Sequence, residues 1–155
     1  MKFSVVRETL LKPLQLVAGV VERKQTMPVL ANVLLEVKDN ELTLTGSDLE
    51  VELVGHIQLD ECQEGRITVP ARKLMDICKS LPDSAVIELS VDDTRAVIRS
   101  GRSRFTLSTL PADEFPNIQD MQGDLSVVVA QNSVRKLIEK TGFAMANQDV
   151  RYYLN

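Results

Sequence analysis

Three carboxylates recur at alternate positions in one short stretch of the chain, Asp48, Glu50 and Glu52. Alternate residues of a β-strand point to the same face, so a strand over residues 48–53 would place all three acids side by side. Such a group could bind Mg²⁺ or supply a general acid and a general base. The residues between them are apolar, and this alternation fits a solvated sheet face more simply.

The other side chains with reactive chemistry offer less. The single histidine, His56, lies on a predicted strand without cysteine partners nearby, which is typical of a surface or packing residue rather than a zinc ligand. Cys62 and Cys78 do not form a close pair, and we interpret them as reduced thiols, with Cys78 in the core. We therefore expect no metal.

Motifs for nucleotide or covalent chemistry are missing from the sequence. It contains no phosphate-cradling glycine loop, dinucleotide fingerprint or nucleophile elbow. With no tryptophan and 4% aromatic residues, platforms for stacking single-stranded bases are not expected either. These observations favour a binding or structural role, without catalysis and without a cofactor.

The composition is that of an ordinary globular protein. The 155 residues are 44% hydrophobic and 26% charged, enough for one domain with a sizeable core plus part of another. No apolar run approaches the roughly 20 residues of a membrane span, and the N-terminus lacks a signal-peptide pattern. We expect a cytoplasmic protein with no membrane partner.

The elements that would position these residues follow one plan twice. Residues 2–6 are predicted as a strand, residues 7–21 as a helix kinked by Pro13, and residues 29–37, 41–53 and 55–59 as a meander that turns at Asp39-Asn40. The second round is a strand at 66–69, a helix at 71–81 that begins after Pro70, and strands at 86–91, 96–100 and 104–110. The pattern predicts an α+β fold built from two repeated strand-helix-strands units.

A third round begins but does not finish. We predict a strand at 125–129, a helix capped by Ser133, and a strand from residue 150. The buried face of this helix would carry Val134, Leu137, Ile138 and Met145. Because this helix has no sheet of its own to pack on, we expect the chain to be part of a longer protein. The proline-rich residues 110–116 and the polar residues up to 124 would form a linker.

The net charge of −4 hides an uneven distribution. The three predicted helices hold eight basic and three acidic residues, a net charge of +5, while the rest of the chain holds ten basic and nineteen acidic residues, a net charge of −9. Basic helices could attract a polyanion, because binding to phosphate needs local positive charge. The alternative is that exposed helix faces favour lysine and arginine for their helix propensity.

Several long strings of the sequence resemble one known family. They are VPARKLMDIC at 69–78, SGRSRFTLSTLP at 100–111 and NQDVRYYLN at 147–155, supported by MKF at the N-terminus and TMPVLANVLL at 26–35. These strings are similar to bacterial sliding clamps, the beta subunits of DNA polymerase III. The resemblance covers the whole chain.

The resemblance implies the DNA clamp fold, with helices on the channel face of each domain and antiparallel sheets on the outer face. Clamps of this family are head-to-tail homodimeric rings with three domains per subunit. Residues 1–122 would be a complete first domain, and residues 123–155 a linker and the start of a second.

The function that the resemblance implies is topological rather than catalytic. A closed ring encircles duplex DNA, slides without sequence specificity and tethers the polymerase, so it acts as a processivity factor in DNA replication. The partners would be double-stranded DNA, the polymerase catalytic subunit, the clamp loader and other proteins that carry a clamp-binding motif.

Three sets of site residues are also implied by the resemblance. The DNA-binding positions are Arg23, Lys24, Gln148, Arg72, Lys79 and Lys136, and the family often has arginine where Lys24 stands. The first wall of a pocket for partner peptides is formed by Arg151, Tyr152 and Leu154. The dimer interface is formed by Lys73, Ile77, Arg95, Arg102, Arg104, Phe105 and Leu107, with Arg99 in the same cluster; protection of an edge strand by charge is the alternative explanation of these arginines.

Two other classes of function stay open at this point. One is a small interaction module that recognises a protein through its edge strand and residues 152–154. The other is a metal-dependent enzyme that uses Asp48, Glu50 and Glu52.

Overall fold

A computed structural model describes residues 1–21, 27–92, 94–116, 126–146 and 150. The chain divides into two compact units, Met1–Ile118 and Gln119–Asn155, which are considered separately below. No helix within the described residues is long and apolar enough to cross a membrane.

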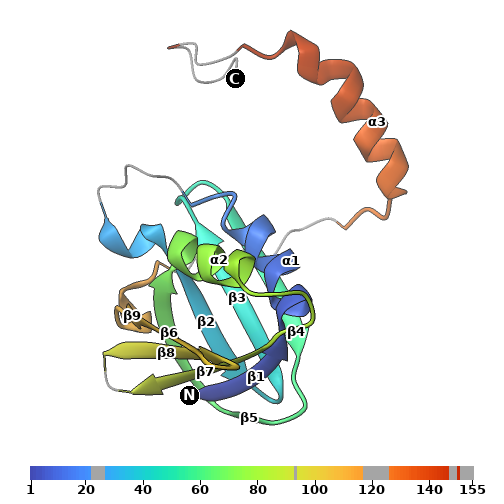
Figure 1. The fold of residues 1–155 in the computed structure, drawn as a ribbon. Helices are drawn as coiled ribbons and strands as arrows, with labels where there is room; N and C mark the ends of the chain where they lie inside the picture. Colours follow the sequence, from blue (N-terminus) through green and yellow to red (C-terminus); the bar gives the residue numbers. More distant parts are fainter. Residues whose placement is uncertain (22–26, 93, 117–125, 147–149, 151–155) are drawn as a thin grey trace. The chain divides into compact units, whose positions relative to one another are not determined.

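Two antiparallel sheets and two helices make up the first unit (Figure 1). The five-stranded sheet has the order β5-β1-β7-β8-β9, and the four-stranded sheet has the order β4-β3-β2-β6. The first repeat is β1 (Lys2–Val6), α1 (Arg7–Val17), β2 (Asn32–Lys38), β3 (Glu41–Ser47) and β4 (Glu52–Gln58). After the short β5 (Cys62–Gln63), the second repeat is β6 (Gly65–Pro70), α2 (Ala71–Ser80), β7 (Val86–Asp92), β8 (Arg95–Ser100) and β9 (Ser103–Ser108). The predicted α+β fold with a doubled strand-helix-strands unit is confirmed.

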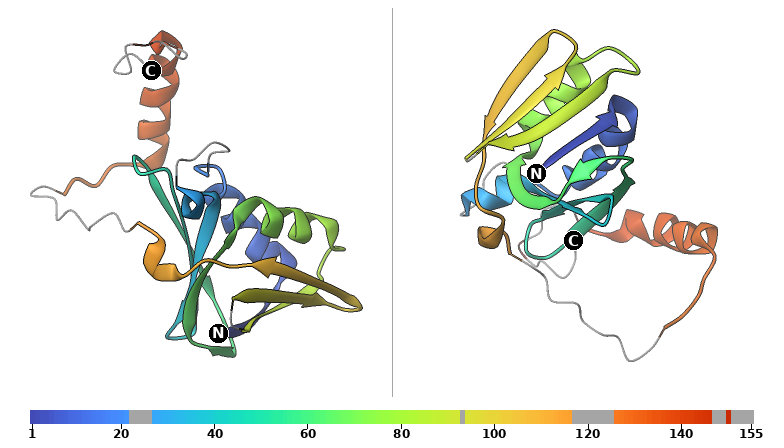
Figure 2. Two further views of the ribbon diagram at one scale, coloured as in Figure 1. Left: turned by 90° about the vertical axis from the view of Figure 1, so that its left-hand side faces the viewer. Right: turned by 90° about the horizontal axis from the view of Figure 1, so that it is seen from below.

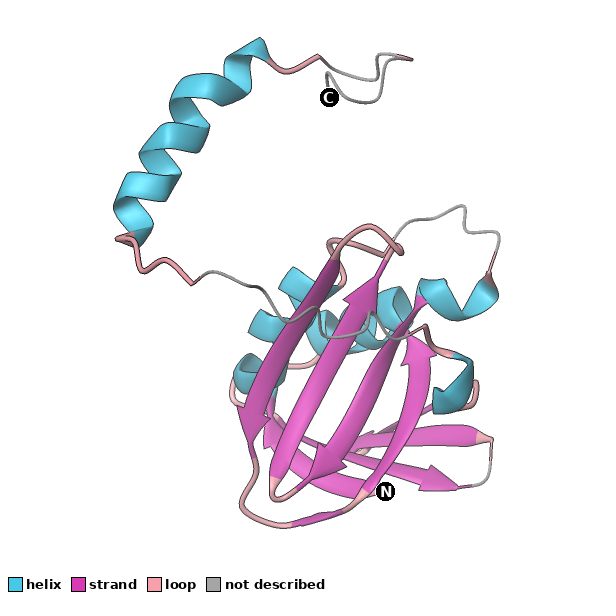
Figure 3. Cartoon of the chain, turned by 180° about the vertical axis from the view of Figure 1, so that it is seen from behind, coloured by secondary structure: helices cyan, strands magenta, loops and turns pink. Residues whose placement is uncertain are grey.

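The two repeats exchange their first strands, so that each of these strands lies in the sheet of the other repeat (Figures 2 and 3). β1 pairs with β7 of the second repeat, and β6 pairs with β2 of the first. The register is equivalent in the two halves, because Ser4 lies opposite Glu88 and Thr68 lies opposite Leu34. Each sheet therefore depends on both repeats.

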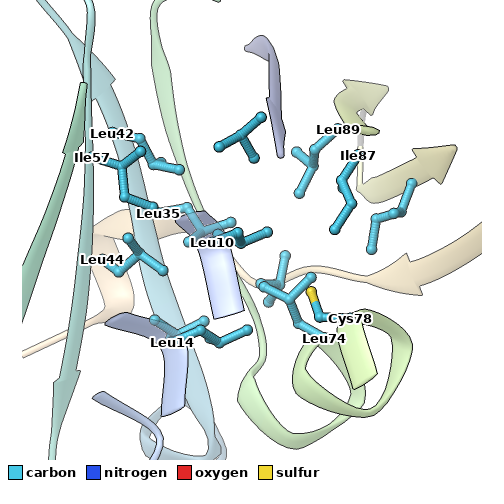
Figure 4. Close-up of a cluster of buried hydrophobic side chains, with 14 of the residues drawn as sticks. Leu10, Leu14, Leu35, Leu42, Leu44, Ile57, Leu74, Cys78, Ile87 and Leu89 are labelled. Carbon is cyan, nitrogen blue, oxygen red and sulfur yellow. The ribbon is translucent and has the colours of Figure 1, made fainter. Parts of the chain in front are cut away.

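One hydrophobic core joins the sheets and the helices. Leu10 and Leu14 of α1 and Leu74 of α2 are fully buried, and they point toward apolar side chains of both sheets (Figure 4). Strand residues alternate between this core and solvent, as in β3, where Leu42 and Leu44 are buried. The predicted helical spacing of apolar residues in α1 and α2 is thereby confirmed.

Several boundaries differ from the sequence-based expectation. α1 ends at Val17 rather than near Val21, and it runs from Arg7 to Val17 with Pro13 inside it. Pro28–Ala31 forms a 3₁₀ helix (η1) where a strand was predicted, because Pro28 cannot donate a ladder hydrogen bond and is better placed at the start of a helical turn.

The predicted linker begins too early. Phe115 packs with Val29 and Leu30 in a second, smaller core, and η2 (Ala112–Glu114) leads into it. Thr68 and Leu110 exchange backbone hydrogen bonds of 3.1 and 3.3 Å, so the segment from Leu110 to Phe115 is part of the first unit.

In the second unit, α3 (Gln131–Thr141) and η3 (Gly142–Ala144) are the described elements. The predicted cap at Ser133 is wrong, because α3 begins at Gln131 with Ala130 as its N-cap residue. Residues 126–129 do not form the predicted strand. The side chains expected on the buried face of this helix are exposed within the described residues, namely Val134, Leu137, Ile138 and Met145.

Candidate functional site

Two cations share the face of α2 that points away from the core. Arg72 and Lys79 are exposed and stand seven residues apart, two helical turns, with Asp76 between them. Leu74 and Cys78 bury the opposite face of the helix against the core. α2 therefore presents basic side chains to solvent at a fixed spacing.

Arg7 has a structural role instead. Its Nε donates a 2.8 Å hydrogen bond to the carbonyl of Cys78 at the end of α2, and its guanidinium pairs with Glu8 and Asp83 at 2.9 and 2.7 Å. The Glu8 carboxylate also accepts a hydrogen bond from the backbone N–H of Ser84, and this bond is the main reason that the pKa of Glu8 is lowered. The exposed cations of the first unit's helices are therefore Lys12, Arg72, Lys73 and Lys79.

A groove of about 380 Å³ separates α2 from the edge strand β9. It brings together four residues of the predicted dimer interface, Lys73 and Ile77 from α2 and Phe105 and Leu107 from β9. Asp76, Ser80 and Thr106 complete its lining, and sequence reasoning did not single them out for this surface. Apolar walls with a charged rim are what a protein partner could fill.

In the first repeat, α1 packs directly on the edge strand β4. Gly55 of β4 makes this approach possible, since a Cβ atom built there would lie 2.8 Å from the Cβ of Pro13. The equivalent strand of the second repeat carries Phe105 opposite Ile98, where β4 carries Gly55 opposite Leu44. Glycine at position 55 therefore allows α1 to approach the edge strand in the first repeat, whereas Phe105 at the equivalent position lines the groove in the second.

The predicted arginine cluster lies on the outer face and end of the same edge. Arg99 stands directly opposite Arg104 in the β8–β9 register, and Arg95 lies four pairs away, opposite Ser108 and Asp92. Arg102 occupies the exposed turn between the two strands. Among the described residues, none of these four arginines forms an ion pair with a distance of 4 Å or less. Like charges directly opposite each other destabilise a sheet, so an acidic partner would relieve this arrangement.

Lys136 lies on α3 in the second unit and is exposed. Its neighbour Arg135 donates a 2.8 Å hydrogen bond to Glu139 one turn later, which is a typical exposed helical ion pair. The remaining predicted site residues lie outside the described residues, namely Arg23, Lys24, Gln148, Arg151, Tyr152 and Leu154.

The three carboxylates at 48–52 do not share a strand face, so both sequence-based interpretations of this stretch are wrong. Asp48 lies in a turn between β3 and β4, and its carboxylate accepts hydrogen bonds from the backbone N–H groups of Glu50 and Val51 at 2.9 and 2.7 Å. These bonds lower the pKa of Asp48, with the larger effect from Val51. Leu49 completes the turn with a φ of 79°. Within the described part of the chain, no group of three histidine, cysteine or acidic residues could hold a metal ion.

The two remaining side chains with potential chemistry have ordinary environments. His56 pairs with Glu41 on the neighbouring strand β3, and both side chains are exposed. Burial raises the pKa of the Cys78 thiol to about 11. The expected core position of Cys78 is confirmed.

Comparison with known proteins gives a consistent result. The family described as DNA polymerase III beta subunit, N-terminal domain, matches residues 1–119. The beta sliding clamp of Pseudomonas putida is 64% identical over the whole chain, and that of Vibrio cholerae is 54% identical. The chain spans 42% and 43% of the length of these two relatives.

Solved structures agree in fold. The Pseudomonas aeruginosa sliding clamp bound to griselimycin matches with a TM-score of 0.95 at 60% identity, covering 100% of this chain and 42% of that one. The Bartonella birtlesii sliding clamp bound to griselimycin matches with a TM-score of 0.96 at 36% identity, with the same coverage. The helices and antiparallel sheets described above are therefore those of the DNA clamp fold, and the chain belongs to the DNA polymerase III beta subunit family, of which it carries the N-terminal domain.

Proposed function

We propose that this chain is the N-terminal part of a sliding clamp that encircles duplex DNA and tethers the replicative polymerase without catalysing a reaction. The observation that carries the proposal is 64% identity over the whole chain to a beta sliding clamp. Residues 1–122 would be the first clamp domain and residues 123–155 a linker and the start of the second. The place of action would be the cytoplasm, where the polymerase and the clamp loader work.

The DNA-facing residues would be Arg72, Lys79 and Lys136, together with Arg23, Lys24 and Gln148. Exposure of the first three cations on helices supports this assignment. Side chains that contact phosphates but not base edges hold the duplex without reading its sequence, and this leaves a ring free to slide.

A chimera tests this assignment. The matching segment of the Pseudomonas putida clamp is replaced by this chain, and binding to primed duplex DNA is measured over a salt series. We expect the chimera to support processive synthesis, and Arg72→Ala with Lys79→Ala to reduce the slope of log affinity against log salt by about 2, because each phosphate contact contributes about 0.9.

Lys2→Ala with Lys38→Ala is the matched control, because both lysines are exposed on strands, β1 and β2, and not on the helices. Lys24→Ala with Gln148→Ala is expected to weaken DNA binding while dimerisation survives. An unchanged salt slope in the Arg72 and Lys79 variant would contradict the assignment.

The dimer interface would be the α2–β9 groove with its arginines: Lys73, Ile77, Arg95, Arg102, Arg104, Phe105 and Leu107. The groove and the like charges of Arg99 and Arg104, which stand directly opposite each other, support an acidic, partly apolar partner edge. We infer a head-to-tail homodimer, whose orientation would be set by this charge complementarity.

Sedimentation velocity on the chimera tests the interface. Lys73→Glu with Arg104→Glu should weaken dimerisation on the order of tenfold or more, because two attractive pairs become repulsive. Lys2→Glu with Lys38→Glu makes the same change of charge outside the groove and should have no effect. Equal dimer stability in both variants would place the interface on another surface.

The partner-peptide pocket would begin at Arg151, Tyr152 and Leu154. This assignment rests on the resemblance of residues 147–155 to the sliding clamp family. Its expected ligands are the clamp-binding segments of the polymerase catalytic subunit, the clamp loader and other clamp-binding proteins.

A further inference from the structure

A hollow of about 650 Å³ lies at the β5 edge of the five-stranded sheet. The proposed clamp function does not use it. Its lining includes Lys2 and Ser4 of β1, Glu88 of β7, and Asp60, Glu61 and Cys62 from the connection between the repeats.

The equivalent place in the other half of the first unit is occupied by the chain itself. Thr68 and Leu34 correspond to Ser4 and Glu88 in the register of the exchanged strands. Leu110 exchanges two backbone hydrogen bonds with Thr68, and it packs with Phe115 and Leu34 in the smaller core. An extended segment therefore already binds one of the two equivalent strand edges.

The segment that follows β4 in the first repeat begins like the segment that follows β9 in the second, but it then takes a different direction. Leu59 N donates to Asn40 O, and Thr109 N donates to Thr94 O, so residues 59 and 109 are equivalent. Leu110 goes on to pair with Thr68, whereas Asp60 and Glu61 turn away and the chain pairs with β1 only through Cys62 and Gln63. This detour leaves the hollow beside Ser4.

The backbone of Ser4 points toward the hollow. Arg7 N donates to Ala85 O and Val91 N donates to Met1 O, so the odd-numbered residues of this strand make the hydrogen bonds to β7. Ser4 lies between them, and its amide and carbonyl face the other edge. β5 pairs with Lys2 and Phe3 and ends before Ser4 is reached.

The residue beneath the bound segment in the filled site and the residue at the base of the hollow differ in chemistry. Where the filled site has Leu34 beneath an apolar segment, the hollow has the exposed Glu88. Arg99 faces Glu88 from β8, but no ion pair joins them within the described residues. Asp60 and Glu61 add negative charge at the rim, against the single cation Lys2. Val6 and Val86 form an exposed apolar pair on the same face, next to Ser4 and Glu88.

We propose that this hollow binds an extended basic segment of a partner protein. The segment adds to the β1 edge at Ser4, places a lysine or arginine over Glu88 and rests an apolar side chain, two residues away, on Val6 and Val86. Backbone hydrogen bonds give the strand addition its affinity, and the pockets for alternate side chains give its specificity.

An acetylated and amidated pentapeptide with the sequence threonine-lysine-threonine-valine-threonine is a suitable probe. It is titrated into the ¹⁵N-labelled 155-residue chain, and the shifts of the backbone amides are followed. We expect shifts at residues 2–6 and at Glu88, and none with a peptide that has glutamate in place of lysine.

Two variants test the role of the residue at the base of the hollow. Glu88→Gln should weaken binding about tenfold, the effect of losing one hydrogen bond to a charged group. Glu114→Gln is the matched control, because Glu114 is an exposed acid on η2 outside the hollow. Glu88→Leu restores the chemistry of Leu34 and should shift the preference from lysine to phenylalanine at the second position of the peptide.

Three outcomes would overturn the proposal. The first is the absence of any shift at residues 2–6 with about 1 mM peptide, a concentration that would reveal even weak binding. The second is a set of shifts confined to β9. The third is an equal loss of affinity in Glu88→Gln and Glu114→Gln. The expected pattern is binding at residues 2–6 that Glu88→Gln weakens and Glu114→Gln leaves unchanged.

Discussion

At the scale of single residues, Asp48 illustrates how a side chain with apparent chemistry serves the backbone. Replacing it with alanine removes the acceptor of two backbone N–H groups in the β3–β4 turn. We expect a loss of roughly 1–2 kcal/mol in the free energy of unfolding, measured with urea, because two bonds are lost and each is worth roughly 0.5–1 kcal/mol in an exposed site. Glu50→Ala, in the same turn, should change stability much less; an equal loss in both variants would contradict this role.

The lowered pKa of Asp48 also predicts how this contribution depends on pH. A carboxylate whose pKa is lower in the folded state stabilises the fold above its ordinary value of 3.8. The contribution is lost as the pH falls through that value and below it. Unfolding curves of the wild type and of Asp48→Ala should therefore converge at acidic pH, and a constant difference down to pH 2 would exclude the mechanism.

Cys78 and Cys62 should differ in reactivity because only the thiolate attacks an alkylating agent. Burial raises the pKa of Cys78 to about 11, whereas Cys62 is partly exposed. We expect iodoacetamide to modify Cys62 in the native chain and to reach Cys78 only after unfolding, as peptide mass spectrometry would show.

Since the unfolded thiol ionises near pH 9, Cys78 also makes the fold less stable as the pH rises above that value.

At the scale of elements, the contact between α1 and β4 depends on Gly55. An alanine there would place its Cβ 2.8 Å from the Cβ of Pro13, so the helix must move away from the strand. Such overpacking typically costs 1–3 kcal/mol, and we expect Gly55→Ala to lower the midpoint of thermal unfolding. Gly142→Ala is the control, because a Cβ at that glycine meets open space. A Gly55→Ala protein as stable as the wild type would show that α1 is not held by this contact.

The elements also show what the sequence could predict. Apolar spacing identified α1 and α2 and most strands, because each buries one face on a continuous core. It failed at residues 48–51, where the alternation of acidic and apolar residues imitates a strand while Asp48 folds the backbone into a turn. Apolar spacing also did not show the shape of the groove or of the hollow, because each is lined by residues far apart in the chain, such as Ile77 and Phe105.

At the scale of the whole molecule, the net negative charge of the chain opposes DNA binding, whereas the proposed ring would favour it. The 155-residue chain carries a net charge of −4. Under the proposed clamp function, its helix cations would hold DNA only weakly unless a ring closes around the duplex. We expect the isolated chain to bind a duplex poorly at physiological salt when binding is followed by fluorescence anisotropy. The chimeric full-length clamp, loaded on a closed circular template, should remain bound, and tight binding by the isolated chain would show that encirclement is not the mechanism.

The exchange of β1 and β6 between the two sheets has a consequence for how the first unit can be taken apart. Each half lends one strand to the sheet of the other, so neither half holds a finished sheet by itself. Cleavage of the chain between Asp60 and Glu61 would leave two fragments, each of which carries a strand that belongs to the sheet of the other. Mixed together, they should reassemble into one domain, whereas each fragment alone would remain without a stable partner for its strands.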